Sequence, residues 1–462
     1  MNILIMCAKI NIHFLGAAGT VTGSKIILDT PEGSFMIDCG LFQGIKQFRL
    51  LNWKNLDFDV GKLKAVLLTH GHLDHTGYLP CLVKQGFKGE IIGTGPTLAI
   101  TRIILEDSAK IQEETAAHAN EEGYSVHTPA LPLYTVADVE ETCKLFTVQP
   151  KEYPISLTKN ISFRFRYSGH ILGATFVEMK VFGKTLIFSG DVGRFNDPVL
   201  HPPSIPDKAD FLFLESTYGD RLHPEEDVEE VLTSLINETL YNRGNLIIPA
   251  FAVERAQLLI YTLWKLFRKN KIPDIPIIVD TPMGIDTLKV FESYQNWHRL
   301  TKGEFYSMQE HIKQVTSYRE TWEVIDNPRP KVIIAGSGMI TGGRVLTYIK
   351  QLGRFENTTI LLVGYQAEGT RGRQLQEGIK ELKIFGKYVP VHARIRQLHS
   401  LSAHADQSEL IKWVSQLKTP PEKVFLVHGE PGAADAFRVK LKSVFGWDTI
   451  IPKLGDIVNI SI

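Results

Sequence analysis

The chain has 462 residues, 44% of them hydrophobic and 22% charged, which is ordinary for a globular protein of two or three domains. Lys plus Arg and Asp plus Glu number 51 each, so the formal net charge is zero. This balance argues against binding nucleic acid through charged tails, although a local basic groove stays open. No run of about 18 apolar residues predicts a membrane span. The absence of a CxxC pair favours reduced thiols in a cytoplasmic protein, at Cys7, Cys39, Cys81 and Cys143.

The first part of the chain is rich in predicted strands. Short apolar or alternating runs predict strands at residues 10–15, 24–29, 35–38, 64–69, 161–167, 174–181 and 185–188. Isoleucines at helical spacing predict one long helix over residues 98–120. A proline-rich segment at residues 197–206 then marks a change in composition and a candidate domain boundary.

From residue 211 to about residue 391 the pattern alternates between strands and helices. We expect buried parallel strands at residues 211–214, 245–249, 275–279, 332–335 and 359–363. Helical segments such as 253–268 lie between them, which indicates an α/β sheet with helices on both faces. The remaining part is expected to contain a helix at 406–417, a strand at 423–427 and a helix at 432–444.

The turn after the predicted strand 64–69 carries the strongest chemical signal. It reads His-Gly-His-Leu-Asp-His, and four of its residues are metal-ligand types, namely His70, His72, Asp74 and His75. One short turn cannot wrap all four around a single ion, but it can direct two at one metal and two at its neighbour. Burying four ionisable side chains without an ion would be costly. The cluster therefore predicts a two-metal hydrolytic site.

Three isolated residues are candidates to complete this site. His170, Asp191 and His428 each follow a predicted strand and lie beside a glycine. Each alone is more typical of a turn residue than of a ligand. Together with the cluster at residues 70–75 they supply seven ligands, a suitable number for two ions that share a bridging carboxylate and a water.

Two glycine-containing turns are candidates for phosphate binding. Gly336, Ser337 and Gly338 lie between a predicted strand and a helix start, where backbone N–H groups and the helix dipole favour an anion. In the loop at 364–373 the candidate phosphate contacts are Thr370, Arg371 and Arg373, although helix capping explains Thr370 equally well. A local positive potential is also expected from three residues near the second predicted boundary, namely Arg394, Arg396 and His399.

The ordered set of motifs resembles the metallo-β-lactamase superfamily and, within it, the β-CASP branch of RNA- and DNA-processing nucleases. Similarity extends over essentially the whole chain. Residues 35–40 and 70–75 match the first two superfamily motifs, and His170 and Asp191 match the third and fourth. The β-CASP motifs A, B and C are matched by Glu215, His404 and His428.

This resemblance implies a fold and a domain order. The expected fold is an α/β metallo-β-lactamase αββα sandwich, with an inserted β-CASP α/β domain whose sheet is mostly parallel. The first domain would begin at 1–208 and return at 394–462, with the β-CASP domain at 209–393 between them. Active-site access would lie between the two domains, and a narrow cleft favours a single strand over a duplex.

The resemblance also implies a role for each motif residue. His70, His72 and His170 would hold one Zn²⁺, Asp74, His75 and His428 would hold a second, and Asp191 would bridge them, with Mn²⁺ as the alternative metal. The implied catalytic residues are Asp38, Asp74, Glu215 and His404. Of these, His404 would supply a proton to the departing oxygen, Glu215 would hold the imidazole of His404, and Asp38 would orient ligands and water.

We therefore expect a zinc-dependent ribonuclease acting on single-stranded RNA in the cytoplasm. An endonuclease is favoured, with 5′ exonuclease action as a second mode, because no KH domain or further C-terminal domain is recognised. Hydrolysis of a small molecule and DNA cleavage are the alternatives. A non-catalytic RNA-binding subunit is disfavoured by the intact ligands, and an iron redox protein by His72, where such members carry Glu. The family leaves a homodimer open.

Overall fold

The structure is a computed structural model that describes residues 9–123, 127–364, 366 and 369–461. Cys7 and part of the predicted phosphate loop, residues 365, 367 and 368, lie outside the described residues. The chain divides into two compact units. Unit 1 contains the chain up to Asp197, Pro202–Leu222 and the residues from His404 onward, and unit 2 contains Pro198–His201 and His223–Ala403. Within the described ranges, no helix is both long and apolar enough to cross a membrane.

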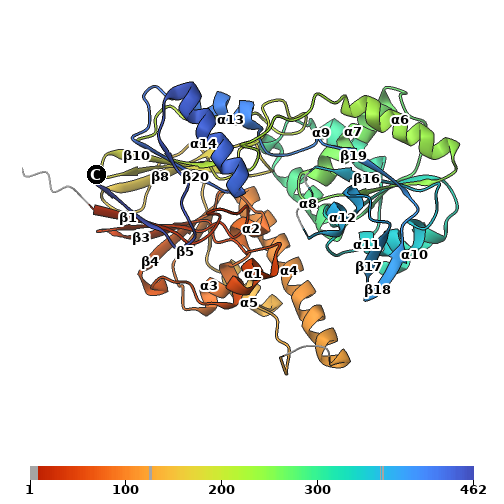
Figure 1. Ribbon diagram of the computed structural model, residues 1–462, viewed down its shortest axis with the longest axis horizontal. Coiled ribbons are helices and arrows are strands. Elements are labelled where there is room, and N and C mark those ends of the chain that lie inside the picture. Colours follow the sequence, from red (N-terminus) through yellow and green to blue (C-terminus); the bar gives the residue numbers. More distant parts are fainter. Residues whose placement is uncertain (1–8, 124–126, 365, 367–368, 462) are drawn as a thin grey trace, which may run out of the picture. The chain divides into compact units, whose positions relative to one another are not determined.

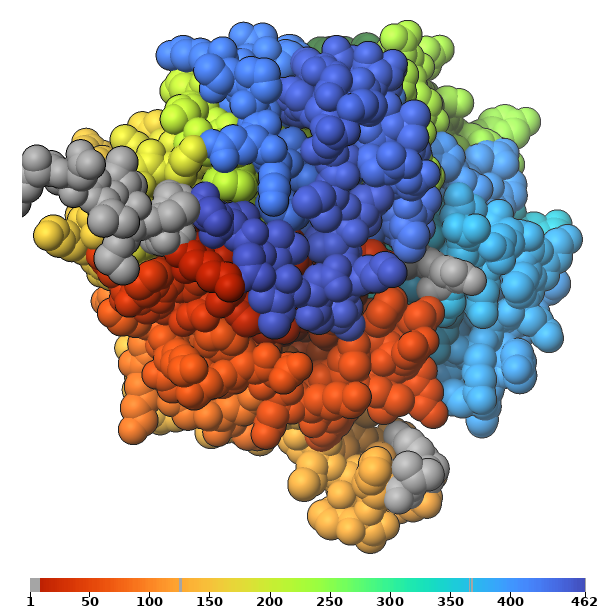
Figure 2. All heavy atoms as spheres, turned by 60° about the vertical axis from the view of Figure 1, so that its left-hand side comes forward, coloured from red at the N-terminus to blue at the C-terminus, as the bar shows by residue number. Residues whose placement is uncertain are grey.

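Unit 1 is built on two seven-stranded sheets. The first has the order β22-β1-β2-β3-β4-β5-β6, from β1 (Lys9–Phe14), β2 (Ile26–Thr30), β3 (Gly33–Ile37), β4 (Leu63–Leu67), β5 (Glu90–Gly93), β6 (Phe146–Val148) and β22 (Ile457–Ser461). The second has the order β21-β20-β11-β10-β9-β8-β7, from β7 (Ile155–Ser156), β8 (Ile161–Tyr167), β9 (Thr175–Val181), β10 (Lys184–Phe188), β11 (Phe211–Glu215), β20 (Lys423–Val427) and β21 (Thr449–Ile450). Strand β22 pairs antiparallel with β1, and Figure 2 shows late residues, in blue, lying against early residues, in red.

The two sheets face each other across an aromatic core. The ring of Phe213 stacks on those of Phe188 and Phe425, at centroid distances of 4.3 and 4.8 Å, and Phe14 of the first sheet lies 5.5 Å from Phe425. Helices cover the outer faces, as Figure 1 shows. They are α1 (Lys46–Arg49), α2 (Leu73–Thr76), α3 (Leu79–Lys84), α4 (Gly95–Glu122), α5 (Val136–Cys143), α13 (Gln407–Val414) and α14 (Pro431–Phe445), with short 3₁₀ turns at Leu50–Trp53 and Val60–Lys62. The expected αββα sandwich is confirmed.

Unit 2 contains a six-stranded sheet in the order β14-β13-β15-β12-β16-β19, and every pairing in it is parallel. Its strands are β12 (Asn245–Pro249), β13 (Ile277–Asp280), β14 (Lys313–Gln314), β15 (Lys331–Ala335), β16 (Thr359–Val363) and β19 (Arg394–Leu398). Its helices are α6 (Val228–Tyr241), α7 (Arg255–Arg268), α8 (Pro282–Ser293), α9 (Lys302–Glu310), α10 (Tyr318–Asp326), α11 (Val345–Leu352) and α12 (Arg371–Gln376), with a 3₁₀ turn at Gln295–Trp297. A separate hairpin is formed by β17 (Glu381–Ile384) and β18 (Lys387–Pro390).

Two strands belong to a different sheet from the one the sequence indicates. β11 was expected to begin the second domain, but it lies between β10 and β20 in unit 1, parallel to both. β19 was expected to begin the return to the first domain, but it pairs with β16 in unit 2. Strand β11 is buried on both faces, so its apolar run is compatible with either sheet. The compact units change after Leu222 and Ala403, whereas the domain boundaries after residues 208 and 393 stay predictions.

Candidate metal centre

Contacts with neighbouring loops fix the position of the turn at residues 70–75. Strand β4 ends at Leu67, and the short helix α2 begins at Leu73. The Thr69 backbone N–H and hydroxyl both donate to the Asp38 carboxylate, at 2.8 Å each. A Cβ on Gly40 would lie 1.5 Å from the Asp74 carbonyl oxygen, so the close approach of these two loops requires glycine at this position. These contacts fix the backbone of the turn between β4 and α2.

The first group of candidate ligands consists of His70, His72, His170 and Asp191. His72 Nδ1 lies 3.1 Å from His70 Nε2 and 3.2 Å from His170 Nε2. Asp191 Oδ2 lies 3.4 Å from the Nε2 atoms of both His70 and His170. Ligands bound at about 2.0–2.1 Å around a tetrahedral ion are about 3.3 Å apart. The spacing of these four atoms therefore fits a divalent metal ion.

The second group consists of Asp74, His75 and His428. His428 follows strand β20, and its Nε2 lies 3.1 Å from His75 Nε2 and 3.3 Å from Asp74 Oδ2. The φ angle of His428 is +48°, in the left-handed region that non-glycine residues rarely occupy. A backbone conformation of this cost at a candidate ligand is consistent with a functional constraint on the position of its ring.

Asp191 lies between the two groups. Its Oδ2 faces the first group, while its Oδ1 lies 3.4 Å from His75 Nε2 and 3.6 Å from His428 Nδ1. The side chain is 1% exposed, and Oδ1 accepts no hydrogen bond from the described residues. A buried carboxylate oxygen is normally satisfied. A cation on each side of Asp191 would satisfy it, so the geometry fits the predicted bridging position.

The three histidines of the first group have lowered pKa values. Burial lowers the pKa of His70 to about 3, with the neighbouring His75 adding to the shift, and burial lowers that of His72 to about 4. Burial and then the charge of His404 hold the pKa of His170 well below its usual value. All three imidazoles are thus neutral at physiological pH and keep a ring nitrogen lone pair for a metal.

Asp38 and Thr217 orient ligands from outside the centre. Asp38 Oδ2 lies 2.8 Å from His75 Nδ1, so the His75 Nδ1–H donates to it and Nε2 is left for a ligand bond. The Thr217 hydroxyl donates to the His428 carbonyl at 3.0 Å and lies 3.1 Å from His428 Nδ1. Asp38 was predicted in this role but Thr217 was missed, although it follows Glu215 in motif A. The sequence signal available for Thr217 was a hydroxyl residue just after a predicted strand.

His404 and Glu215 form a pair beside the first group. His404 Nδ1 lies 3.2 Å from Glu215 Oε2, and its Nε2 lies 4.0 Å from Asp191 Oδ2. Glu215 is fully buried at the end of β11, and its Oε1 also accepts the Val192 N–H at 2.6 Å. Burial disfavours the imidazolium, but the charges of Glu215 and then Asp191 outweigh it and raise the pKa of His404 to about 9. The pair can therefore present a proton next to the candidate metal centre.

Comparison with known proteins agrees with this geometry. Residues 19–219 match the metallo-beta-lactamase superfamily, residues 256–375 the Beta-Casp domain, and residues 388–452 the Zn-dependent metallo-hydrolase RNA specificity domain. Ribonuclease TTHA0252 of Thermus thermophilus is 34% identical over 96% of this chain and 98% of its own length. An RNase J-like protein of Methanocaldococcus jannaschii is 31% identical over 97% of this chain and 99% of its own length.

The chain belongs to the β-CASP branch of the metallo-β-lactamase superfamily. The transcription termination factor FttA of Methanocaldococcus jannaschii is a further relative, 31% identical over 98% of this chain and 72% of its own length. A protein of unknown function from Enterococcus faecalis shares the fold, with a TM-score of 0.55 and 14% identity over 98% of this chain and 100% of its own. Use of a divalent metal follows from the metallo-hydrolase family and the His and Asp groups together.

The predicted phosphate contacts lie in unit 2, where this β-CASP chain uses several of them to hold its own backbone. Ser337 Oγ accepts the Thr341 N–H at 3.0 Å within the turn that contains Gly336 and Gly338.

In the second predicted phosphate loop, Thr370 caps helix α12 by accepting the Arg373 N–H at 3.3 Å, as the capping alternative predicted. Arg371 donates to the carbonyls of three residues, Lys383, Ile340 and Thr341. Arg373 pairs with Glu377 at 2.7 Å. Phosphate binding by these residues stays a prediction.

The basic residues near the second predicted boundary also lie in unit 2. Arg394 and Arg396 belong to β19, and Arg394 forms an ion pair with Glu238 of α6. Closeness in the sequence to His404 therefore does not place them in the unit that holds it. His399 donates its backbone N–H to Glu226 at 2.9 Å.

Proposed function

We propose that the protein is a zinc-dependent phosphodiesterase that cleaves single-stranded RNA. The observation that carries this proposal is the buried Asp191, whose two oxygens face two separate groups of candidate ligands. The names of the relatives, a ribonuclease and an RNase J-like protein, support RNA as the substrate class. Two Zn²⁺ ions per chain is the composition we propose, since histidine nitrogen and carboxylate oxygen suit this metal.

In this proposal each side chain has a distinct task. His70, His72 and His170 would hold one ion, Asp74, His75 and His428 would hold the other, and Asp191 would contact both. Bound ions would supply a water of lowered pKa and would stabilise charge on a phosphoryl oxygen. The Asp38 carboxylate fixes the ring orientation and tautomer of His75, and Thr217 does the same for His428.

His404 acts as the general acid. When the phosphodiester bond breaks, the departing oxygen of the RNA needs a proton, and His404 Nε2 points toward the centre while its Nδ1 faces Glu215. Glu215 is buried and already accepts the Val192 N–H, so its orientation is fixed. Because the carboxylate favours the imidazolium, His404 stays protonated until the proton is transferred.

Endonuclease action is the mode we propose, with 5′ exonuclease action as the second candidate. The inserted α/β domain and the His404 and Glu215 pair disfavour hydrolysis of a small molecule such as a lactam or thioester, because small-molecule hydrolases of the superfamily lack both. DNA stays an alternative substrate, since no residue described in the centre distinguishes a 2′-hydroxyl.

The test is cleavage of a 5′-labelled single-stranded RNA by the wild type and by His404→Ala, with metal content measured on both. Single-stranded DNA and a chromogenic lactam serve as competing substrates, and His118→Ala on the exposed face of α4 is the matched control. We expect internal fragments from the wild type and the control. The metal-replete His404→Ala variant should be slower by about a hundredfold or more.

Each contrary result corrects a defined part of the proposal. Release of mononucleotides alone would make the enzyme an exonuclease. Lactam turnover without RNA cleavage by fully metallated protein would overturn the nuclease assignment. Loss of bound metal in His404→Ala would place His404 among the ligands rather than as the acid.

A further inference from the structure

The hairpin of β17 and β18 has one face in the core and one in solvent. Leu382, Ile384 and Val389 are buried in the core of unit 2. Lys383 lies directly opposite Tyr388 in the antiparallel register, and because opposite residues share a face, both point away from that core. Tyr388 is 69% exposed. The alternation therefore explains the apolar face of the hairpin but leaves an aromatic ring in solvent on the other.

The tip of the hairpin carries a second exposed aromatic side chain. Phe385 and Gly386 form the two-residue turn, with φ angles of +48° and +77°. Such turns favour Asn, Asp or Gly at the first position, because both central residues have positive φ. A phenylalanine that is 58% exposed in this conformation gains little burial and carries backbone strain. Neither folding nor turn formation explains the choice of Phe385.

The solvent face of the hairpin is also positively charged. It carries Lys383, and Lys350 of α11 places its Nζ 5.6 Å from the centroid of the Phe385 ring. Lys387 is also exposed, at the end of the turn, but it lies opposite Ile384 and so belongs to the other face. Among the described residues, these three lysines form no ion pair with a carboxylate. Exposed aromatic rings set among unpaired cations are the features that bind single-stranded nucleic acid without sequence preference.

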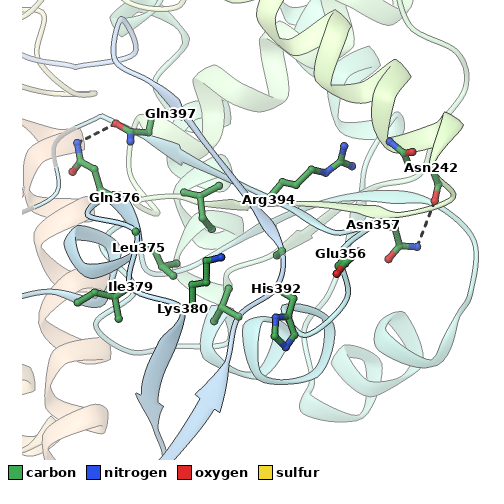
Figure 3. A pocket seen from close by; sticks show the side chains of 14 residues that line it. Asn242, Glu356, Asn357, Leu375, Gln376, Ile379, Lys380, His392, Arg394 and Gln397 are labelled. Atoms are coloured by element: carbon green, nitrogen blue, oxygen red, sulfur yellow. Dashed lines mark hydrogen bonds between the residues drawn. The ribbon is translucent and has the colours of Figure 1, made fainter.

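A pocket of about 790 Å³ begins where the two strands leave the body of unit 2. Figure 3 shows Lys380, His392 and Arg394 projecting around it. Arg394 is held through Nη1 by Glu238, while its Nε and Nη2 are buried and have no hydrogen-bond partner among the residues that the structure describes. The pocket thus adds Lys380 to the cations beside the hairpin, although Glu356 also lines it.

We propose that the β17–β18 hairpin is a binding platform for single-stranded RNA. Nucleobases stack on Phe385 and Tyr388, the lysines neutralise phosphates, and the backbone continues toward the pocket at Lys380. This inference rests on the proposed function for the identity of the nucleic acid. Arg371 fixes the platform in place, because its Nε donates to the Lys383 carbonyl at 2.7 Å while its Nη1 donates to the turn at Ile340 and Thr341.

The first test measures the affinity of a fluorescent single-stranded oligoribonucleotide in the His404→Ala background, where cleavage does not interfere. Phe385→Asn and Tyr388→Ala should each weaken binding about tenfold. The double change Lys383→Gln and Lys387→Gln should weaken binding and reduce the dependence of affinity on salt. Tyr153→Ala and Lys313→Gln, exposed residues elsewhere, should bind like the background.

Phe385→Asn provides a readout that a structural role would not give. Asparagine tolerates positive φ, so this variant should be as thermally stable as its parent, or more so, while it binds RNA more weakly. Lower stability with unchanged RNA affinity would overturn the proposal. So would competition by an acidic polypeptide as effective as that by unlabelled RNA, because the platform would then recognise a protein.

The failures of the two proposals are distinguishable. If the wild type cleaves RNA and the hairpin variants bind and cleave it equally well, the platform is wrong and the nuclease assignment stands. If metallated wild type cleaves no RNA but the hairpin variants still lose RNA affinity, the platform stands and the nuclease assignment is wrong.

Discussion

Each unit buries an aspartate just after or at the end of a strand, and the two differ in what surrounds them. Asp191 in unit 1 follows β10, is 1% exposed, and faces imidazole nitrogens at 3.4–3.6 Å without a hydrogen bond to Oδ1. Asp280 in unit 2 ends β13 and is fully buried. It accepts hydrogen bonds from Thr321 and Tyr348 at 2.7 Å each and pairs with Arg344 at 2.5 Å.

Burial alone therefore does not separate a functional carboxylate from a structural one. The oxygens of Asp280 are satisfied by donors within unit 2, so the role of this residue is to stabilise the fold of that unit. Oδ1 of Asp191 accepts no hydrogen bond from the described residues and faces ring nitrogens at 3.4–3.6 Å, so a cation would complete its surroundings. The difference between satisfied and unsatisfied partners is what identifies the centre.

The largest effect is expected for Asp191→Asn. Removing the shared carboxylate charge should lower the metal content and reduce RNA hydrolysis by about a thousandfold or more. Elemental analysis beside the cleavage assay measures both, and Asp435→Asn, which lies on the exposed side of α14, is the control. Full metal content in Asp191→Asn would show that Asp191 does not bridge the ions.

Asp280→Asn should give the opposite pattern. Because it removes the charge that pairs with the partly buried Arg344, the free energy of unfolding should fall by about 3 kcal/mol. Metal content per folded molecule should match the wild type. Chemical denaturation followed by elemental analysis of the folded fraction checks this, and a loss of metal with unchanged stability would show that Asp280 serves the metal centre and not the fold of unit 2.

Glu215→Gln tests a carboxylate that both accepts the Val192 backbone N–H and contacts the His404 ring. The amide can still hydrogen-bond His404, but it no longer stabilises the imidazolium, so the rate should fall about a hundredfold with metal retained. Since the charge of Glu215 raises the pKa of His404, its removal lowers that pKa. The alkaline limb of the pH–rate profile should then move to lower pH, and an unmoved limb would contradict the role of His404.

The smallest effects compare two neighbouring arginines. Arg371→Ala removes three hydrogen bonds to carbonyls and should lower the stability of the protein by about 2 kcal/mol. Arg373→Ala breaks an exposed i,i+4 pair with Glu377 and should cost about 0.5 kcal/mol or less. Thermal denaturation of the two variants measures the difference. Equal, small losses would show that Arg371 does not support the turn and the hairpin.

The sequence was most informative where the residue chemistry is unusual. Four ligand-type side chains in one turn have few structural explanations, so the cluster from His70 to His75 could be interpreted directly. His170 and His428 could not be distinguished from turn residues until the family motifs ordered them. The apolar patterns also predicted the presence of individual elements reliably. Examples are the long helix α4 and strand β8, which occupies the predicted residues 161–167.

Sequence reasoning was weakest where one pattern fits two environments. An apolar run of four or five residues does not indicate which sheet it joins, and β11 was therefore assigned to the wrong one. An arginine beside a glycine loop suits a phosphate and a carbonyl alike, and Arg371 contacts carbonyls. Asp280 and Arg344 carry no local signal, because their pairing depends on residues far apart in the chain.

The order of the strands in unit 1 has a consequence for how the protein is made. Residues 70–75 are synthesised long before His428, which follows β20, and β22 pairs with β1 only when residues 457–461 have been made. Domains fold as their chains emerge, yet the candidate centre lacks one of its proposed ligands until residue 428 has been added. We therefore expect a nascent chain to gain metal-dependent activity only after that point of its synthesis.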